Sequence, residues 1–176
     1  MTLLTISTLA RCSDLAPANC LKRNQVRFNQ DGSLTLVLFG IKNDSDRKGF
    51  EIRVEKSSDP KCDPVQTLKD YMTRTSKNGT PEALFIKTTS FDPLSARGVS
   101  EVLRNAIKRA GLSDLYTPRC FRPSAASAAI KTGCDHESVR QLGRWKTREV
   151  FYENYVYPLP KSDTTDKILT SDINVY

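Results

Sequence analysis

The run of small residues SAASAAIK, residues 124 to 131, constrains the fold of this chain most strongly. Its alanines at positions 125, 126, 128 and 129 would let a helix approach its neighbours closely. Pro123 suits the first turn of such a helix, where its missing N–H has no partner to lose. The sequence therefore predicts a closely packed helix that begins after Arg122, holds that arginine rigid and ends at Gly133.

The remaining segments predict an α+β fold, mostly helical, with a small three-stranded antiparallel sheet near the N-terminal side. Between Gln25 and Arg53, alternating apolar residues and the turn Asp31-Gly32 indicate the three strands. Apolar spacings of three and four residues indicate helices over residues 3–15, 65–75 and 95–110, and short helices around Val139 and Phe151. Residues 83–86 read as a short strand-like run.

Composition points to a single domain with a polyanionic partner. The chain has 176 residues, a formal net charge of +7 and five cysteines without a disulfide or zinc spacing. The positive charge fits nucleic acid, and also an anionic membrane surface. No apolar run approaches the roughly 20 residues that cross a bilayer. We expect an intracellular protein with reduced thiols, located in the nucleus.

Two arginines, three residues apart, lie just before the predicted small-residue helix, and a group of tyrosines follows it. Arg119 and Arg122 form a pair of planar guanidinium forks, which can grip several phosphate oxygens at once. A hydroxyl of Tyr152, Tyr155 or Tyr157 beside such a clamp could attack the phosphorus. The pattern therefore indicates chemistry on a phosphodiester.

The order of these motifs resembles the catalytic domain of the tyrosine recombinases, also called the phage integrase family. It consists of the two arginines, the small residues, Gly143-Arg144-Trp145 and then a tyrosine. The GRW motif and a tyrosine followed shortly by proline resemble recombinases of eukaryotic mobile elements of the DIRS and crypton type. The resemblance implies an integrase-like catalytic domain over residues 1–160, with the N-terminal DNA-gripping domain absent. The tail, residues 161–176, is expected either to be disordered or to dock on a neighbouring protomer.

The resemblance assigns most of the candidate catalytic residues. LARCSDL resembles the first box of the family, which makes Arg11 a phosphate-binding arginine and Asp14 its orienting partner. Lys42, at the end of a strand, is the candidate for the catalytic lysine of the family, and Lys48 is the alternative. Arg119 stands where the family usually has histidine, and arginine cannot share protons at neutral pH.

The C-terminal motif supplies the remaining candidates. We predict that the indole N–H of Trp145 donates to a phosphate oxygen and that Arg144 contacts a phosphate. Tyr155 is the predicted nucleophile, because it lies one turn after Phe151 and a proline follows three residues later. Tyr152 and Tyr157 remain alternatives.

The arginines of residues 95–110 have two readings, a solvated helix face or a DNA-contacting one. With a DNA partner we expect Arg97 and Arg104 to bind it, beside Arg144 and Lys48. We predict double-stranded DNA as partner, a homo-oligomer on that DNA, and no membrane, small-molecule substrate, cofactor or metal.

These assignments predict a DNA strand transferase for site-specific recombination or integration, through a covalent 3′-phosphotyrosyl intermediate. One alternative is a degenerate, domesticated relative that binds DNA without cutting it. The other is a type IB topoisomerase, which shares the chemistry.

Overall fold

The N-terminal half is built on a small antiparallel sheet. The computed structural model describes residues 1–16, 21–40, 48–76 and 82–156. Strands β1 (Val26–Phe28), β2 (Leu34–Leu38) and β3 (Phe50–Val54) lie in that order, and Leu36 of β2 pairs with Val26 and Ile52. The three predicted strands are confirmed.

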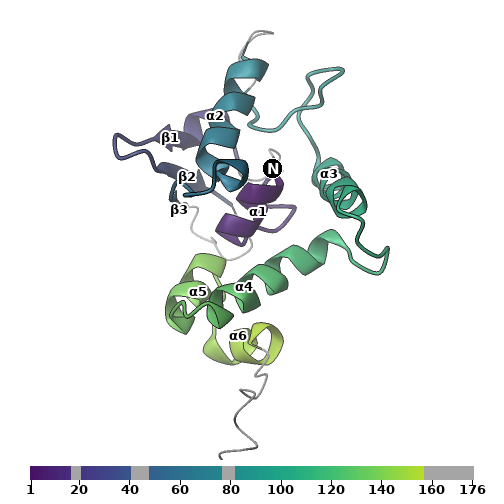
Figure 1. The fold of residues 1–176 in the computed structure, drawn as a ribbon. Coiled ribbons are helices and arrows are strands. Elements are labelled where there is room, and N and C mark those ends of the chain that lie inside the picture. Colours follow the sequence, from purple (N-terminus) through teal and green to yellow (C-terminus); the bar gives the residue numbers. More distant parts are fainter. Residues whose placement is uncertain (17–20, 41–47, 77–81, 157–176) are drawn as a thin grey trace, which may run out of the picture.

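Helices α1 (Thr2–Thr8), α2 (Pro64–Thr75) and α3 (Ala96–Arg109) share one apolar core with this sheet. Asp63 caps α2, because its carboxylate accepts from the N–H groups of Val65 and Gln66. Residues 84 and 85 and two residues of α3, Val99 and Leu103, complete the same core. Figure 1 shows α3 on one side of α1, with the sheet and α2 on the other.

The C-terminal half is helical. Helices α4 (Phe121–Lys131), α5 (His136–Gly143) and α6 (Arg148–Tyr155) gather below α1 in Figure 1. Their core is formed by Ala126, Val139, Trp145 and Phe151 together with Leu9, which follows α1. Short 3₁₀ helices occupy Arg23–Gln25, Pro60–Cys62 and Pro118–Cys120. Six α-helices and one three-stranded sheet, counted over the described ranges, confirm the predicted fold class.

The first helix is shorter than the periodicity of residues 3–15 predicts. It ends at Thr8, because Leu9 adopts a left-handed conformation with a φ of 50°. The Leu9 carbonyl instead accepts a hydrogen bond from Arg122, 113 residues further along the chain. A tertiary contact thus replaces the next helical turn.

Three smaller differences concern element boundaries. Residues 83–86 form no strand and make only the isolated bridges Lys22–Ala83 and Ile86–Pro93. The small-residue helix starts at Phe121, so Arg122 lies inside its first turn and not before it. His136 opens α5, capped by Asp135.

Over the described residues, no helix has both the length and the apolar character required for crossing a membrane.

Candidate active site

A cavity of about 800 Å³ lies where the turn after α1, α3, the start of α4 and the end of α6 meet. Four of its lining residues are arginines and one is a tyrosine; among the described lining residues none is acidic. The lining consists of Ala10, Arg11, Cys12, Ser13, Ala96, Ser100, Arg104, Thr117, Pro118, Arg119, Arg122, Pro123 and Tyr155. The structure therefore brings Arg11, Arg119, Arg122 and Tyr155 to one basic hollow.

Arg122 is the most deeply set of these arginines, with 6% of its surface exposed. Its Nη1 donates to the Leu9 carbonyl at 2.8 Å, and its Nη2 donates to the Gly143 carbonyl. Burial, together with the positive charges of Arg11 and Arg144, lowers the pKa of Arg122 to about 10. These contacts fix the guanidinium. Because the neighbouring charges are also positive, a bound anion would stabilise its charged form.

The other two arginines of the predicted clamp reach the cavity from separate elements. Arg11 lies in the turn after α1, where its backbone N–H donates to Asp14 Oδ2 at 2.9 Å. Arg119 comes from the 3₁₀ helix before α4 and is exposed. Asp14 was expected to orient the Arg11 side chain; the contact it makes with Arg11 is to the backbone amide.

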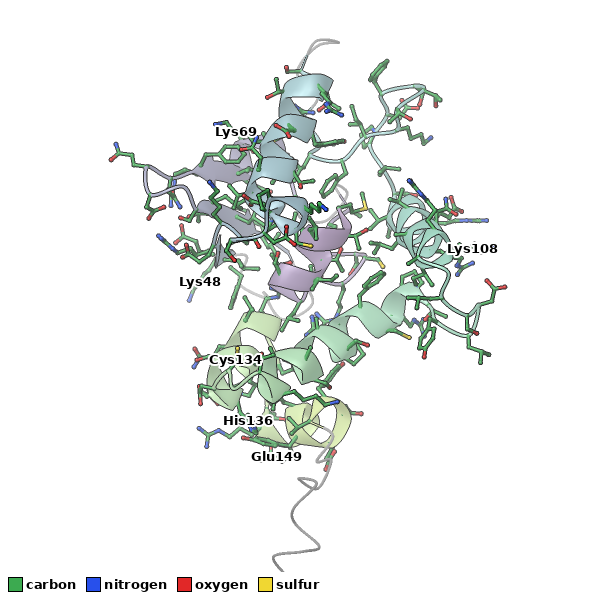
Figure 2. All side chains as sticks on the ribbon, viewed as in Figure 1. Lys48, Lys69, Lys108, Cys134, His136 and Glu149 are labelled. Carbon is green, nitrogen blue, oxygen red and sulfur yellow. The ribbon has the colours of Figure 1, made fainter. Side chains whose placement is uncertain are left out.

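The tyrosines differ in what they face. Tyr155, the last residue of α6, lines the cavity, and its backbone carbonyl accepts from Ser127 Oγ of α4 at 2.9 Å. The hydroxyl of Tyr152 lies 3.2 Å from Nδ1 of His136, which Figure 2 labels at the start of α5. Tyr157 lies outside the described residues. Of the two described candidates, Tyr155 is the one at the arginine-lined hollow.

Trp145 lies behind the cavity and is not part of its lining. Its ring centroid is 4.4 Å from that of Tyr155 and 4.9 Å from that of Phe151. The Arg122 guanidinium carbon stands over the same ring, 4.2 Å from its centroid. Its indole nitrogen is buried and has no hydrogen-bond partner in the described part of the chain. The packing role of Trp145 is visible, whereas its predicted donation to phosphate stays a prediction.

Arg144 requires a correction. It was predicted to contact DNA phosphate, but only 4% of its surface is exposed. Its Nη2 forms an ion pair with Asp14 Oδ2 at 3.2 Å, and its Nη1 donates to the Leu142 carbonyl at 3.1 Å. Arg122 is similarly buried but lines the cavity, whereas Arg144 is held by these partners and is not among the lining residues, so the structure does not place it at a DNA contact.

The remaining predicted residues are spread more widely. Arg104 lines the cavity, whereas the side chain of Arg97 is 90% exposed on α3, 3.1 Å from Glu101 and outside the lining. Lys48 is exposed beside the sheet, on the side of the molecule away from Lys108 of α3 (Figure 2). Lys42 lies outside the described residues. The structure does not bring Arg97 or Lys48 to the hollow.

Four further lining residues were not singled out from the sequence: Cys12, Ser13, Ser100 and Thr117. Burial raises the pKa of the Cys12 thiol, which also forms a hydrogen bond with the side chain of Ser100. Small hydroxyl residues are frequent everywhere in proteins, so no local pattern could have marked these. Among the described residues, no group of three His, Cys, Asp or Glu side chains could hold a metal ion.

Comparisons with known proteins identify the family and the fold. Residues 1–161 match the model of the Phage integrase family. A sequence comparison with curated proteins gives no match.

Several solved structures share the fold at low sequence identity. The XerH site-specific recombinase, in a post-cleavage complex with a palindromic difH substrate, is 15% identical with a TM-score of 0.70, over 96% of this chain and 44% of that one. The Tn1549 transposon integrase with circular intermediate DNA is 12% identical with a TM-score of 0.64, over 96% and 57%. A lambda integrase dimer on a COC′ core site is 18% identical with a TM-score of 0.58, over 91% and 52%. The chain spans about half the length of these proteins.

Proposed function

Since this chain belongs to the phage integrase family, we propose that it is a DNA strand transferase that carries out site-specific recombination. One observation carries the proposal: Arg11, Arg119, Arg122 and Tyr155 line one cavity of about 800 Å³, although they come from three separate parts of the chain. Solved recombinases and integrases with the same fold are bound to DNA, which supports DNA as the partner.

The cavity suits a phosphodiester in the transition state of phosphoryl transfer. Negative charge grows on the non-bridging oxygens as the nucleophile attacks, and preorganised cations lower its energy. Arg122 is fixed by backbone carbonyls before any substrate arrives, so little reorganisation accompanies the reaction. Arg11 and Arg119 would grip the same phosphate from the other walls.

In the proposed step, Tyr155 Oη attacks the scissile phosphorus. A bond forms between the phenol oxygen and phosphorus, and the bond from phosphorus to the 5′ oxygen breaks. The phenol proton leaves to solvent, and the departing 5′ oxygen takes up a proton, for which Lys42 is the predicted donor. The product is a 3′-phosphotyrosyl link and a free 5′-hydroxyl.

The covalent link conserves the energy of the phosphodiester. The 5′-hydroxyl of another strand can therefore attack it and reverse the step without ATP, which exchanges strands. We propose that two or more copies act together on double-stranded DNA, since a similar integrase is a dimer on its core site. A eukaryotic mobile-element origin of the DIRS or crypton type and a nuclear location are part of the proposal.

A trapping experiment tests this function. The protein is incubated with a pool of duplexes that carry a randomised core and a nick, so that the short cleaved strand diffuses away and the adduct accumulates. We expect a covalent protein–DNA species on a denaturing gel, with the modified peptide containing Tyr155. No adduct with any member of the pool would contradict the proposal.

A second candidate is a degenerate relative that binds DNA without cutting it. Two observations favour it: Arg119 occupies the position where the resemblance leads one to expect histidine, and Trp145 does not reach the cavity lining. On this account DNA binds with no adduct, and Tyr155→Phe leaves binding unchanged. Relaxation of supercoiled plasmid would instead indicate the topoisomerase.

A further inference from the structure

We propose that Arg144 and Asp14 form a buried positioning pair, which locks the turn that carries Arg11 onto the segment that carries Trp145. Through this pair, the position of Arg11 in the cavity is coupled to the position of the Trp145 ring that packs against Tyr155. The consequence for catalysis rests on the proposed function, whereas the mechanical coupling does not.

Arg144 reaches back across the molecule to the end of α1. Its Nη1 lies 3.4 Å from the carbonyl oxygen of Thr8, and its Nη2 lies 3.4 Å from that of Leu9. The same Nη2 pairs with Asp14 Oδ2 at 3.2 Å. One guanidinium therefore contacts both ends of the turn that contains Arg11.

Asp14 completes the connection from the other side. Its Oδ2 accepts from the Arg11 backbone N–H at 2.9 Å as well as from Arg144. The side chains of Asp14 and Arg144 are each only 2% exposed. A buried charge without its partner is strongly unfavourable, so loss of either residue would loosen the turn, and loss of Asp14 would also remove the acceptor of the Arg11 amide.

The backbone of Arg144 ties this turn to the other wall of the site. Arg144 ends α5 in a left-handed conformation with a φ of 59°, directly between Gly143 and Trp145. Trp145 in turn packs against Tyr155 and under Arg122. A shift of Arg144 would move the Arg11 turn and the Trp145 ring together.

Because Arg144 is buried, its proposed positioning role can be distinguished from a direct contact with DNA. Because the Arg144 side chain is enclosed, its replacement should change DNA affinity little and the rate of the chemical step strongly. Small misplacements of a catalytic group can cost about 100-fold in rate. A positioning role is thus recognised by a slow step on normally bound DNA.

The first test measures the turn without any reaction on DNA. Cys12 follows Arg11, is half-buried and has a raised thiol pKa, so N-ethylmaleimide should modify it slowly in the native protein. We expect Arg144→Met and Asp14→Asn each to speed its modification about tenfold, followed by peptide mass spectrometry. The exposed Cys134 is the internal reference for the reactivity of the reagent, and the circular dichroism spectrum of each variant shows whether it has unfolded.

Arg23→Met is the matched control. Arg23 is also a buried arginine, 8% exposed, but its Nη1 donates to the Met72 carbonyl at the end of α2, far from the cavity lining. We expect this variant to lose stability and to leave the Cys12 rate unchanged. Equal Cys12 rates in Arg144→Met, Asp14→Asn and the native protein would overturn the proposal.

The second test is a double-mutant cycle in the adduct assay, with single-turnover rates on the nicked pool. Arg144→Met alone should slow adduct formation about 10- to 100-fold, with DNA affinity within about threefold. In an Arg11→Ala background the same change should slow adduct formation by less than about threefold, because the effects of residues that act as a unit are not additive. Full additivity would show that Arg144 does not act through Arg11. If the native protein forms no adduct, the proposed function fails, while the Cys12 measurement still decides the coupling.

Discussion

The guanidinium carbon of Arg122 lies 4.2 Å from the centre of the Trp145 ring. The same ring also packs against Phe151 and Tyr155 of α6. One indole therefore contacts both the central arginine of the cavity and the tyrosine proposed to attack. This shared contact helps to set the relative position of the two.

Replacing that side chain should be costly. Trp145→Ala removes a buried ring from the core of α4, α5 and α6, and we expect a loss of about 3–5 kcal/mol in the free energy of unfolding. Trp145→Phe keeps a ring against Tyr155 and should cost less, about 1–2 kcal/mol. Urea denaturation followed by circular dichroism measures both. Equal stability of the alanine variant and the native protein would show that the ring is not packed as described.

Gly143 leaves no room for a side chain beside the same ring. A Cβ built on Gly143 would lie 1.7 Å from Trp145 Cζ3, so Gly143→Ala must displace the indole. We expect a destabilisation of about 3 kcal/mol or more, as for severe overpacking. Gly98→Ala in α3 is the control, since the nearest atom to its Cβ would be the flexible end of the Leu94 side chain, at 2.8 Å. It should cost far less, and comparable thermal unfolding of the two variants would contradict the packing.

Local patterns predicted the elements well and their long-range partners poorly. The strands and α2 and α3 follow from alternation, apolar spacing and caps, which are properties of neighbouring residues. The first helix was predicted too long, because its end at Leu9 is set by Arg122. No window of sequence around Leu9 contains that information.

The same limit explains the outcome for the site. Arg11, Arg119, Arg122 and Tyr155 could be identified because they belong to ordered motifs, and the structure brings them together. Arg144 was expected to contact a phosphate, whereas the structure buries its side chain. Its partner is Asp14, 130 residues away in the sequence, and only the folded chain shows that pairing.

Acid should weaken the interactions of Glu137, which bonds to Arg140 and Gln141 within α5 and pairs with Arg148 of α6 at 3.4 Å. Hydrogen bonds from Arg140 and Gln141 lower the pKa of Glu137 from 4.5 to about 2. Because the folded-state pKa is the lower one, the carboxylate stabilises the fold above pH 4.5, and this stabilisation is lost as the pH falls towards 2. Glu137→Gln should therefore flatten the dependence of stability on pH within that window.

Glu149→Gln is the matched control for the acid experiment. Glu149 is an exposed residue in the first turn of α6 (Figure 2), and its replacement should keep the native pH dependence. Unfolding free energies from pH 2 to 6 compare the variants. The explanation fails if Glu137→Gln keeps the full acid dependence of the native protein.

DNA binding should depend on the arginines of α3 in a salt-sensitive way. Each phosphate contact contributes about −0.9 to the slope of log K against log salt concentration. Arg97→Ala and Arg104→Ala should each weaken binding and reduce the size of that slope by about 0.9. Arg53→Ala is the control, because Arg53 lies on β3 instead of α3 and pairs with two carboxylates, those of Asp31 and Glu55, each at 2.6 Å. Fluorescence anisotropy across a salt series would refute the assignment if Arg53→Ala changed the slope as much.

The most direct test of the account compares two tyrosines of α6 in the trapping assay with the nicked pool. Tyr155 lines the arginine cavity, whereas the hydroxyl of Tyr152 lies beside His136. The account predicts that Tyr155→Phe abolishes the covalent protein–DNA adduct while DNA affinity is retained, and that Tyr152→Phe forms the adduct at close to the native rate. An adduct that persists in Tyr155→Phe, or one that is lost only in Tyr152→Phe, would contradict it.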